Sequence, residues 1–307
     1  MPGEDRIDPA SLEAAIIRYY QSQQFKALRE ITKKTYRTNI EWLRARFGPL
    51  PIAEMRPKHV KKIMSERADT PTQANKTLKM MKLIVSTAID DEMITHDPTA
   101  GVKPFKIAGD GYHSWTEQEI LQFETRFKTG TKERLAMALL LFTAQRRSDV
   151  VRMGWQHISL DGIRVTQQKT GAELILPIHP ALAEILAQTS KTNLTILITE
   201  YGRPYTSNGF GNWFAKACKR AGIPQCSSHG LRKAAARRLA EAGATAHEIM
   251  AVTGHQSVAE VTRYTKAAEQ AAMARRAMTL VSDQKSNGKM ANPVKKVRQK
   301  NAQDIEN

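Results

Sequence analysis

Residues 229–264 read HGLRKAAARRLAEAGATAHEIMAVTGHQSVAEVTRY and combine strong helix signals with side chains that carry chemistry. Residues 229–243 have the composition of a helix, and capping boxes of the Ser/Thr-x-x-Glu type stand at 245–248 and 257–260. Gly254 is the expected C-terminal stop of the short helix between these boxes. The stretch therefore predicts three successive helices, the last one running to about residue 280.

The whole chain is strongly basic. It has 307 residues, with 47 Lys and Arg against 30 Asp and Glu, and a formal net charge of +17. At about 150 residues per domain, this length suggests two domains, and a hydrophobic content of 41% suffices for a buried core. The positive excess is present in residues 1–105, 106–280 and 281–307 alike. This distribution favours a polyanionic partner such as DNA or RNA, with a merely solubilising surface as the alternative.

Several classes of protein are excluded by simple features. The longest apolar run, Leu135 to Phe142, is far shorter than the roughly 20 residues of a membrane helix. The N-terminus has no cationic segment leading into an apolar one, so no secretory signal is expected. Two cysteines, Cys218 and Cys226, cannot form a disulfide framework or a four-cysteine zinc site. We expect a cytoplasmic protein without a membrane partner.

The positions of Pro and Gly residues predict the boundaries of domains and linkers. Four ranges are expected: a helical domain at 8–102, a linker at 103–114, a second domain at 115–281 and a disordered basic tail at 282–307. Apolar residues at helical spacing in the first domain predict helices at 11–25, 30–47, 57–64 and 71–94.

The second domain mixes helices and strands. A capping box at 116–119 begins its first helix, and the apolar run 135–142 predicts a helix buried on all sides. Residues 163–168 and 173–178 have strand character, and the residues between them form a hairpin turn. A further helix is expected at 207–221.

Some residues of this domain suit the cleavage of a phosphodiester. Without a metal, cleavage needs cations to neutralise the charge that develops on the non-bridging oxygens, and guanidinium groups grip two oxygens at once. Arg146 and Arg232 form the natural pair, and Arg232 shares a helix face with His229, three residues earlier. Tyr264 could serve as the nucleophile. Taken singly, these residues could equally be surface arginines and a half-buried core tyrosine.

The order of the motifs is more specific than any one of them. Thr143–Asp149, Lys169–Gly171, His229–Arg232, Gly254–His255 and Tyr264 follow one another as they do in the tyrosine recombinase (phage integrase) family, which this chain resembles over about residues 10–280. The resemblance implies a mainly α fold with a small β-sheet, in which a helical core-binding domain precedes an α+β catalytic domain. It also implies a site-specific integrase of a prophage or mobile element, which cleaves and rejoins DNA through a covalent 3′-phosphotyrosine without metal, ATP or other cofactor.

The resemblance also implies a role for each site residue. Tyr264 is similar to the family's nucleophile, and Lys169 to the general acid that protonates the leaving 5′ oxygen. His229 and His255 look like hydrogen-bond donors to the phosphate, beside Arg146 and Arg232. Asp149 is similar to an acidic residue that orients the arginine or His229.

Two departures from the family pattern stand in this chain. Ala144-Gln145 precedes Arg146 where the family has Gly-Leu, and Asp149 replaces the more usual Glu. Neither removes a catalytic group, but the effect of both on activity is open.

The resemblance further implies double-stranded DNA at attachment sites as partner, a homotetramer on the synapsed DNA, and a nucleoid-associated location. Accessory excision or bending proteins are candidate additional partners. The alternatives are a tyrosine recombinase that resolves chromosome or plasmid dimers, a type IB topoisomerase, and a non-enzymatic helix-turn-helix regulator built on residues 234–264. The regulator would leave the lysine turn and Arg146 without a role.

Overall fold

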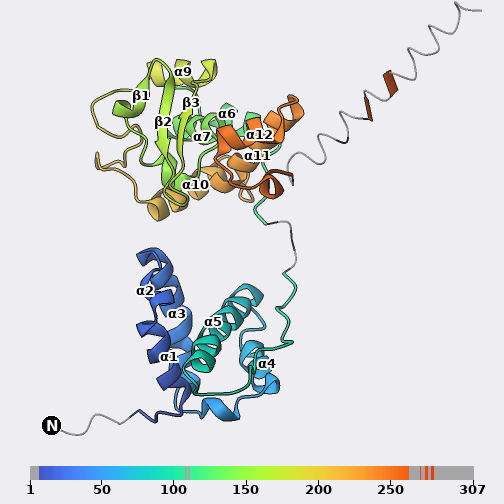
Figure 1. Cartoon of the computed structure of the whole chain (residues 1–307). Coiled ribbons are helices and arrows are strands. Elements are labelled where there is room, and N and C mark those ends of the chain that lie inside the picture. The colour runs from blue at the N-terminus through green and yellow to red at the C-terminus, as the bar shows by residue number, and fades with distance from the viewer. Residues whose placement is uncertain are drawn as a thin grey trace, which may run out of the picture. The chain divides into compact units, whose positions relative to one another are not determined.

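The chain forms two compact units, which divide between Gly109 and Asp110, within residues 103–114. The computed structural model describes residues 7–107, 109, 111–262, 270, 274–275 and 278–279. Each unit has its own apolar core, and the helices and strands of both units are labelled in Figure 1. Among the described helices, none is long and apolar enough to cross a membrane.

The first unit is built from helices. They are α1 (Leu12–Gln21), α2 (Gln23–Lys26), α3 (Glu30–Phe47), α4 (Pro57–Ser65) and α5 (Pro71–Asp90), with a 3₁₀ turn η1 at Ile52–Glu54. Proline begins both α4 and α5, a position where its missing N–H has no helical partner to lose. α1 packs against α3 and α5, and these helices bury Ile16, Leu43 and Ile84 completely.

Two predicted helix limits in this unit were wrong. The helix expected at 11–25 breaks at Ser22, whose side chain accepts a hydrogen bond from the Phe25 N–H and thereby begins α2. The helix expected at 71–94 ends at Asp90. There Glu92 adopts a left-handed backbone with φ of 57°, and the Met93 N–H turns back to the carbonyl of Ala88.

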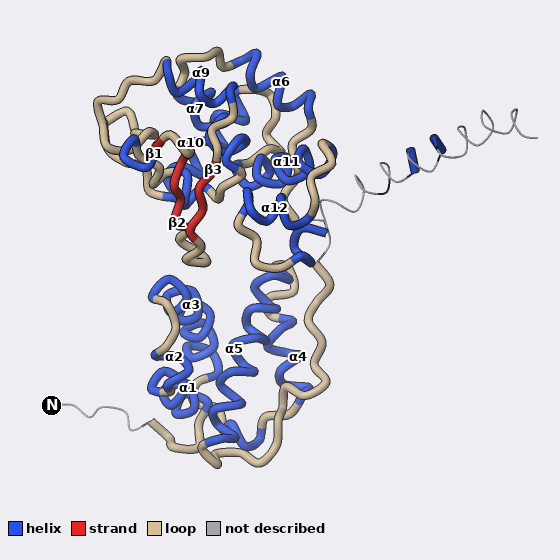
Figure 2. The backbone as a smooth tube through the Cα atoms, turned by 45° about the horizontal axis from the view of Figure 1, so that its top comes forward, coloured by secondary structure: helices blue, strands red, loops and turns tan. Residues whose placement is uncertain are grey.

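The second unit combines helices with a three-stranded sheet. Its elements are α6 (Glu117–Arg126), α7 (Lys132–Thr143), α8 (Arg147–Val150), a 3₁₀ turn η2 (Trp155–His157), β1 (Ile158–Ser159), β2 (Gly162–Thr166), β3 (Glu173–Leu176), α9 (Pro180–Ala187), α10 (Ser207–Arg220), α11 (Ser228–Glu241) and α12 (Ala246–Thr253). The sheet is antiparallel in the order β1-β2-β3, shown in red in Figure 2. Ile163 pairs with Leu176 and Thr166 with Glu173.

Helix α7 forms the centre of the second unit. It packs against α9 and α11, and its residues from Leu135 to Leu141 are all buried. This confirms the buried helix that the apolar run predicts, and the fold as a whole confirms a mainly α protein with a small sheet. The helix ends at Ala144, which adopts the left-handed conformation with φ of 53°.

Local signals predicted some elements of this unit and missed others. The capping boxes that begin with Thr116 and Thr245 are both formed, and Gly254 ends α12 with φ of 69°. The short elements α8, α9 and β1 were not predicted, and both predicted strands end earlier than expected. Residues 258–262 are helical, whereas Tyr264 and the predicted tail 282–307 lie outside the described residues.

Candidate active site

The predicted catalytic residues within the described ranges all belong to the second unit, at points where its elements begin, end or turn. Arg146 is the N-cap of α8, Lys169 lies in the β2–β3 turn, His229 and Arg232 belong to the first turns of α11, and His255 follows α12. The charges of Arg232, Arg146 and Lys169 all act on His255. The fold thus gathers these five residues, and Tyr264 is the one that lies outside the described residues.

Arg232 occupies the point where two helix ends meet. Its side chain is almost fully buried, with 3% exposed. Its Nη1 donates to the carbonyl of Ala144, after α7, at 2.7 Å and to the carbonyl of Thr253, in α12, at 2.8 Å. The last carbonyls of a helix have no partner within the helix and carry a partial negative charge. Two helix ends therefore stabilise one buried guanidinium.

Arg146 is tied to the same place through a glutamine. Its Nη1 donates to Oε1 of Gln167 at 2.8 Å, and Nε2 of Gln167 donates to the Thr253 carbonyl at 2.8 Å. That carbonyl also accepts from Arg232. The two arginines that the chemistry pairs are thus connected through one side chain and one carbonyl oxygen.

Ala144 and Gln145, the first departure from the family pattern, follow the end of α7. Glycine adopts positive φ at no steric cost, whereas Ala144 adopts the same region with a Cβ and with some strain. Gln145 is completely buried. Its Nε2 donates to the carbonyls of Thr143 and Val252, so that it satisfies one terminal carbonyl of α7 and one of α12.

The surroundings of both histidines favour the neutral imidazole. Partial desolvation, followed by the charges of Arg232 and Lys233, lowers the pKa of His229, although its side chain stays exposed on one side. Burial, followed by the charges of Arg232 and Arg146, lowers the pKa of His255 to about 4. The ring of His229 also packs against that of Tyr112, with 4.7 Å between the centroids. An added anionic phosphate would act in the opposite direction and favour the charged imidazoles.

The proton of His255 can be assigned from its neighbour. The Thr253 hydroxyl donates to the carbonyl of Ile249 at 2.7 Å, and its oxygen lies 2.8 Å from Nδ1 of His255. Since the hydroxyl has one proton, Nδ1 is the donor in this pair. Neutral His255 then carries a lone pair on Nε2 and donates from that nitrogen only after taking up a proton.

Asp149 has a different partner from the one the resemblance implied. Its carboxylate is buried, and Oδ1 accepts from the backbone N–H of Gln168 at 2.8 Å rather than from Arg146 or His229. Gln168 directly precedes Lys169 in the β2–β3 turn. Asp149 therefore fixes the backbone of the turn that carries the lysine.

Lys169 stands in a turn that is closed by backbone bonds. The Gln167 N–H donates to the carbonyl of Ala172, and the Gly171 N–H donates back to the carbonyl of Gln167, both at 2.8 Å. Gly171 has φ of 75°, which glycine accommodates readily. The lysine itself is exposed on this turn.

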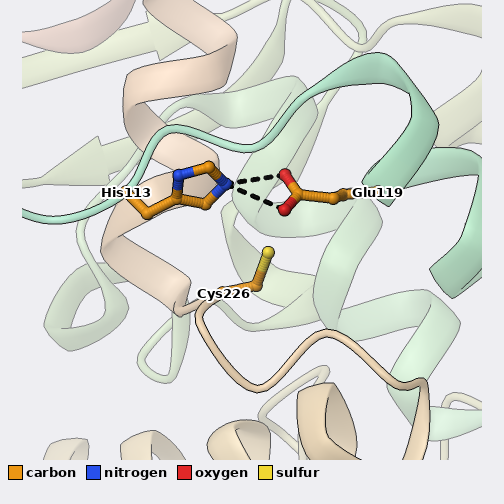
Figure 3. A group of neighbouring side chains, drawn as sticks. All are labelled: His113, Glu119 and Cys226. Atoms are coloured by element: carbon orange, nitrogen blue, oxygen red, sulfur yellow. Dashed lines mark hydrogen bonds and ion pairs between the residues drawn. The ribbon is translucent and has the colours of Figure 1, made fainter.

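One group of metal-ligating side chains occurs among the described residues. His113, Glu119 and Cys226 place one donor atom each within 4.8 Å of the others (Figure 3). The Glu119 carboxylate already accepts from the N–H of Thr116, from His113 and from Gln225. Against the effect of burial, these bonds lower its pKa to about 2.

The same cluster links three segments of the unit. Burial, the charge of Glu119 and a hydrogen bond to it raise the pKa of the Cys226 thiol, which favours the protonated form over the thiolate that metals bind. The bonds to Glu119 hold the segment before α6 against the loop that leads into α11. In addition, the indole N–H of Trp115 donates to the carbonyl of Ser227 at 2.9 Å. Both contacts fix the start of the helix that carries His229 and Arg232.

Comparison with known proteins gives one consistent result. The model of the phage integrase family matches residues 115–271. The integrase of Escherichia phage HK022 is 24% identical over 256 residues, which are 76% of this chain and 70% of that protein. The crystal structure of a lambda integrase dimer bound to a COC′ core site has a TM-score of 0.75 at 22% identity and covers 83% of this chain and 95% of that one.

A second solved structure, a lambda integrase tetramer bound to a Holliday junction, has a TM-score of 0.72 at 23% identity over 80% of this chain and 78% of that chain. At such identities these structures show a shared fold. The family model, by contrast, matches more than half of the chain and ends beyond the predicted nucleophile. The chain therefore belongs to the phage integrase family, and it is a site-specific recombinase.

Proposed function

We propose that this recombinase cleaves and rejoins double-stranded DNA through a covalent bond between Tyr264 and a 3′ phosphate. The observation that carries the proposal is the pairing of Arg146 and Arg232 through Gln167 and the Thr253 carbonyl. Two guanidinium groups fixed in this way can donate hydrogen bonds to the non-bridging oxygens of one phosphate. In the transition state they neutralise the developing charge, so the step requires no metal ion.

The cleavage step needs no ATP, because one phosphorus–oxygen bond forms as another breaks. The phenol oxygen of Tyr264 attacks phosphorus, the bond from phosphorus to the 5′ oxygen breaks, and the phenolic proton is lost to a base or to water. Lys169 gives a proton to the departing 5′ oxygen, so that a hydroxyl leaves. Because the phosphotyrosine retains the energy of the broken bond, attack by a 5′ hydroxyl reverses the step and rejoins a strand.

His229 and His255 serve the same phosphate. When the phosphate binds, its negative charge offsets the surrounding cations, and a protonated imidazole becomes a good donor to a non-bridging oxygen. His229 can also move a proton at Tyr264. The unprotonated Nε2 of His255 in the free protein means that its donor role depends on substrate binding.

Membership of the family also suggests the DNA substrate and the protein partners of this chain. We propose that the substrate is a pair of attachment sites and that four copies act on the synapsed DNA, as lambda integrase forms a tetramer on a Holliday junction. The HK022 integrase matches this chain over 76% of its length, and this likeness favours a prophage or mobile-element integrase over a dimer-resolving recombinase. Accessory excision or bending proteins are further candidates.

A nicked suicide substrate tests the proposal. Cleavage near the nick releases a short fragment, so that religation fails and the protein stays attached to DNA. The wild-type protein is expected to form an adduct that survives denaturation, while Tyr264→Phe binds the same DNA and forms none. Loss of an adduct in wild type on every candidate attachment site would rule out the covalent mechanism. An adduct that persists in Tyr264→Phe would assign the nucleophile elsewhere.

A further inference from the structure

We propose that Gln167, supported by Gln145, is a positioning residue that holds Arg146, the Lys169 turn and the His255 turn in register for DNA cleavage. This inference rests on the proposed function and adds to it a pair of residues that act through the catalytic groups. Neither glutamine needs to touch DNA for this role.

The Gln167 amide uses its full hydrogen-bonding capacity. Its Oε1 accepts from Arg146 Nη1 and from the Thr170 hydroxyl, both at 2.8 Å. Its Nε2 donates to Gln145 Oε1 at 2.6 Å and to the Thr253 carbonyl at 2.8 Å. An amide has two donors and two lone pairs, and all four are satisfied here. One side chain therefore bonds to an arginine, to the residue after Lys169 and to the residue two before His255.

Gln145 extends this network to two helix ends. It receives the bond from Gln167 and donates to the carbonyls of Thr143 and Val252 at 2.9 and 2.8 Å. Both glutamines are buried, with exposures of 0% for Gln145 and 1% for Gln167. In an environment of low dielectric, each of these bonds is strong and each unsatisfied group is costly, so the arrangement has little freedom to shift.

The packing around Gln167 is as specific as its bonding. A Cβ added to Gly254 would lie 2.4 Å from Gln167 Nε2, so the amide lies directly against the glycine that ends α12. The next residue is His255. The position of this histidine relative to Arg146 is therefore set through the Gln167 amide on one side and through the Thr253 carbonyl on the other.

The distribution of buried polar groups indicates a role beyond folding. In the second unit, the described buried polar residues other than Ser228 and Asp149 are the two glutamines, Thr143, Arg232 and Thr253, all within this network. Apolar residues fill the rest of its core. Apolar side chains of similar volume could also fill the space of the glutamines, but they would leave Arg146 without its acceptor.

The test compares two neighbouring glutamines in the same turn. Gln167→Met removes all four hydrogen bonds of the amide with little change in volume, and Gln168→Met changes an exposed side chain as the matched control. The measurements are single-turnover cleavage of the suicide substrate at saturating DNA, the DNA dissociation constant and the thermal unfolding midpoint. Gln145→Met provides a second variant in the network in case Gln167→Met does not fold.

We expect Gln167→Met to fold and bind DNA while cleaving roughly 10²-fold more slowly, the size of effect that a displacement of about 1 Å produces. Gln168→Met should cleave like the wild type. In an Arg146→Ala background, Gln167→Met should cause a clearly smaller further loss than in the wild type, because part of its effect acts through that arginine. Wild-type rates in both network variants, or a full additional loss in the Arg146→Ala background, would overturn the inference. Absence of an adduct in wild type would instead count against the proposed function.

Discussion

Two arginines, one in each unit, show how differently the same side chain is used. Arg67, in the first unit, stacks on the ring of Trp42 with its guanidinium carbon 3.6 Å from the centroid. Its Nη1 donates to Asn39 Oδ1 at 3.3 Å and to Thr77 Oγ1 at 3.1 Å. Arg232, in the second unit, donates to the backbone carbonyls of two helix ends.

The difference in partners suggests that Arg67 contributes to packing and Arg232 to the chemistry of the site. The partners of Arg67 belong to α3 and α5, so its bonds join helices of one bundle, and burial lowers its pKa. The Thr253 carbonyl that accepts from Arg232 also accepts from Gln167, and Gln145 donates to the nearby carbonyls of Thr143 and Val252. An arginine that packs on a ring should affect stability, whereas an arginine held at helix ends beside other cations should affect cleavage.

The largest effect is expected from Arg232→Lys. Lysine retains the positive charge but lacks the planar fork that can contact two carbonyls and a phosphate together. Single-turnover cleavage should fall about 10²–10³-fold, the usual cost of removing one donor to a developing charge. Binding of the suicide substrate, measured by its dissociation constant, should change little. A variant that cleaves at the wild-type rate would remove Arg232 from the transition state.

The same substitution at Arg67 sharpens the contrast. Arg67→Lys loses the guanidinium that stacks on Trp42 and the planar group that donates to both Asn39 and Thr77. The free energy of unfolding should therefore fall by about 1–2 kcal/mol. Chemical denaturation measures this change. Cleavage of bound DNA should stay at the wild-type rate, and a loss like that of Arg232→Lys would contradict the division of roles.

Gly254→Ala tests the contact between α12 and the glutamine network. Its φ of 69° makes alanine strained, and the new Cβ would press on Gln167 Nε2. Gly243→Ala is the control, because Gly243 also has a positive φ, of 92°, but a Cβ there meets nothing within 4 Å. Both variants should lose roughly 1 kcal/mol of stability from backbone strain. Only Gly254→Ala should also slow cleavage, and equal cleavage rates would show that the contact is unimportant.

The smallest effect concerns pH and His255. Its pKa of about 4 in the folded chain lies below the ordinary value of 6.5, so the unfolded chain binds this proton first as the pH falls. The contribution of neutral His255 to stability is therefore complete above about pH 6.5 and is lost progressively towards pH 4. Urea denaturation between pH 4 and 7.5 should show a shallower decline for His255→Gln than for wild type. Identical slopes would mean that another group dominates this range.

Much of the fold could be predicted from local signals. The apolar run of α7 and the capping boxes at Thr116 and Thr245 are decided within a few residues, and the structure has them as predicted. The break at Ser22 and the two-residue strand β1 could not be predicted in the same way. The helix that follows Ser22 has four residues and β1 has two, and elements this short have little periodicity of their own.

Some residues of the candidate site could likewise be predicted from the sequence, and others could not. Arg146 and Arg232 could be proposed from the sequence because cleavage of a phosphodiester favours paired guanidinium groups and the order of the motifs supports this pair. Gln145 and Gln167 gave no such signal, since glutamine is usually exposed. Their burial is explained only by the fold. Gln145 bonds to the carbonyl of Val252, 107 positions away, and Gln167 bonds to the carbonyl of Thr253, 86 positions away.

Ala144 has a consequence for how this sequence can change over generations. The joint between α7 and Arg146 requires a backbone with φ of 53°. Glycine reaches this conformation without strain and asparagine or aspartate with little, whereas valine, isoleucine and threonine are nearly excluded. Although it contributes no charge or proton, this position accepts very few of the twenty amino acids. Neutral drift at the joint is thereby confined to a short set of substitutions, and saturation mutagenesis should recover that set as the tolerated alleles.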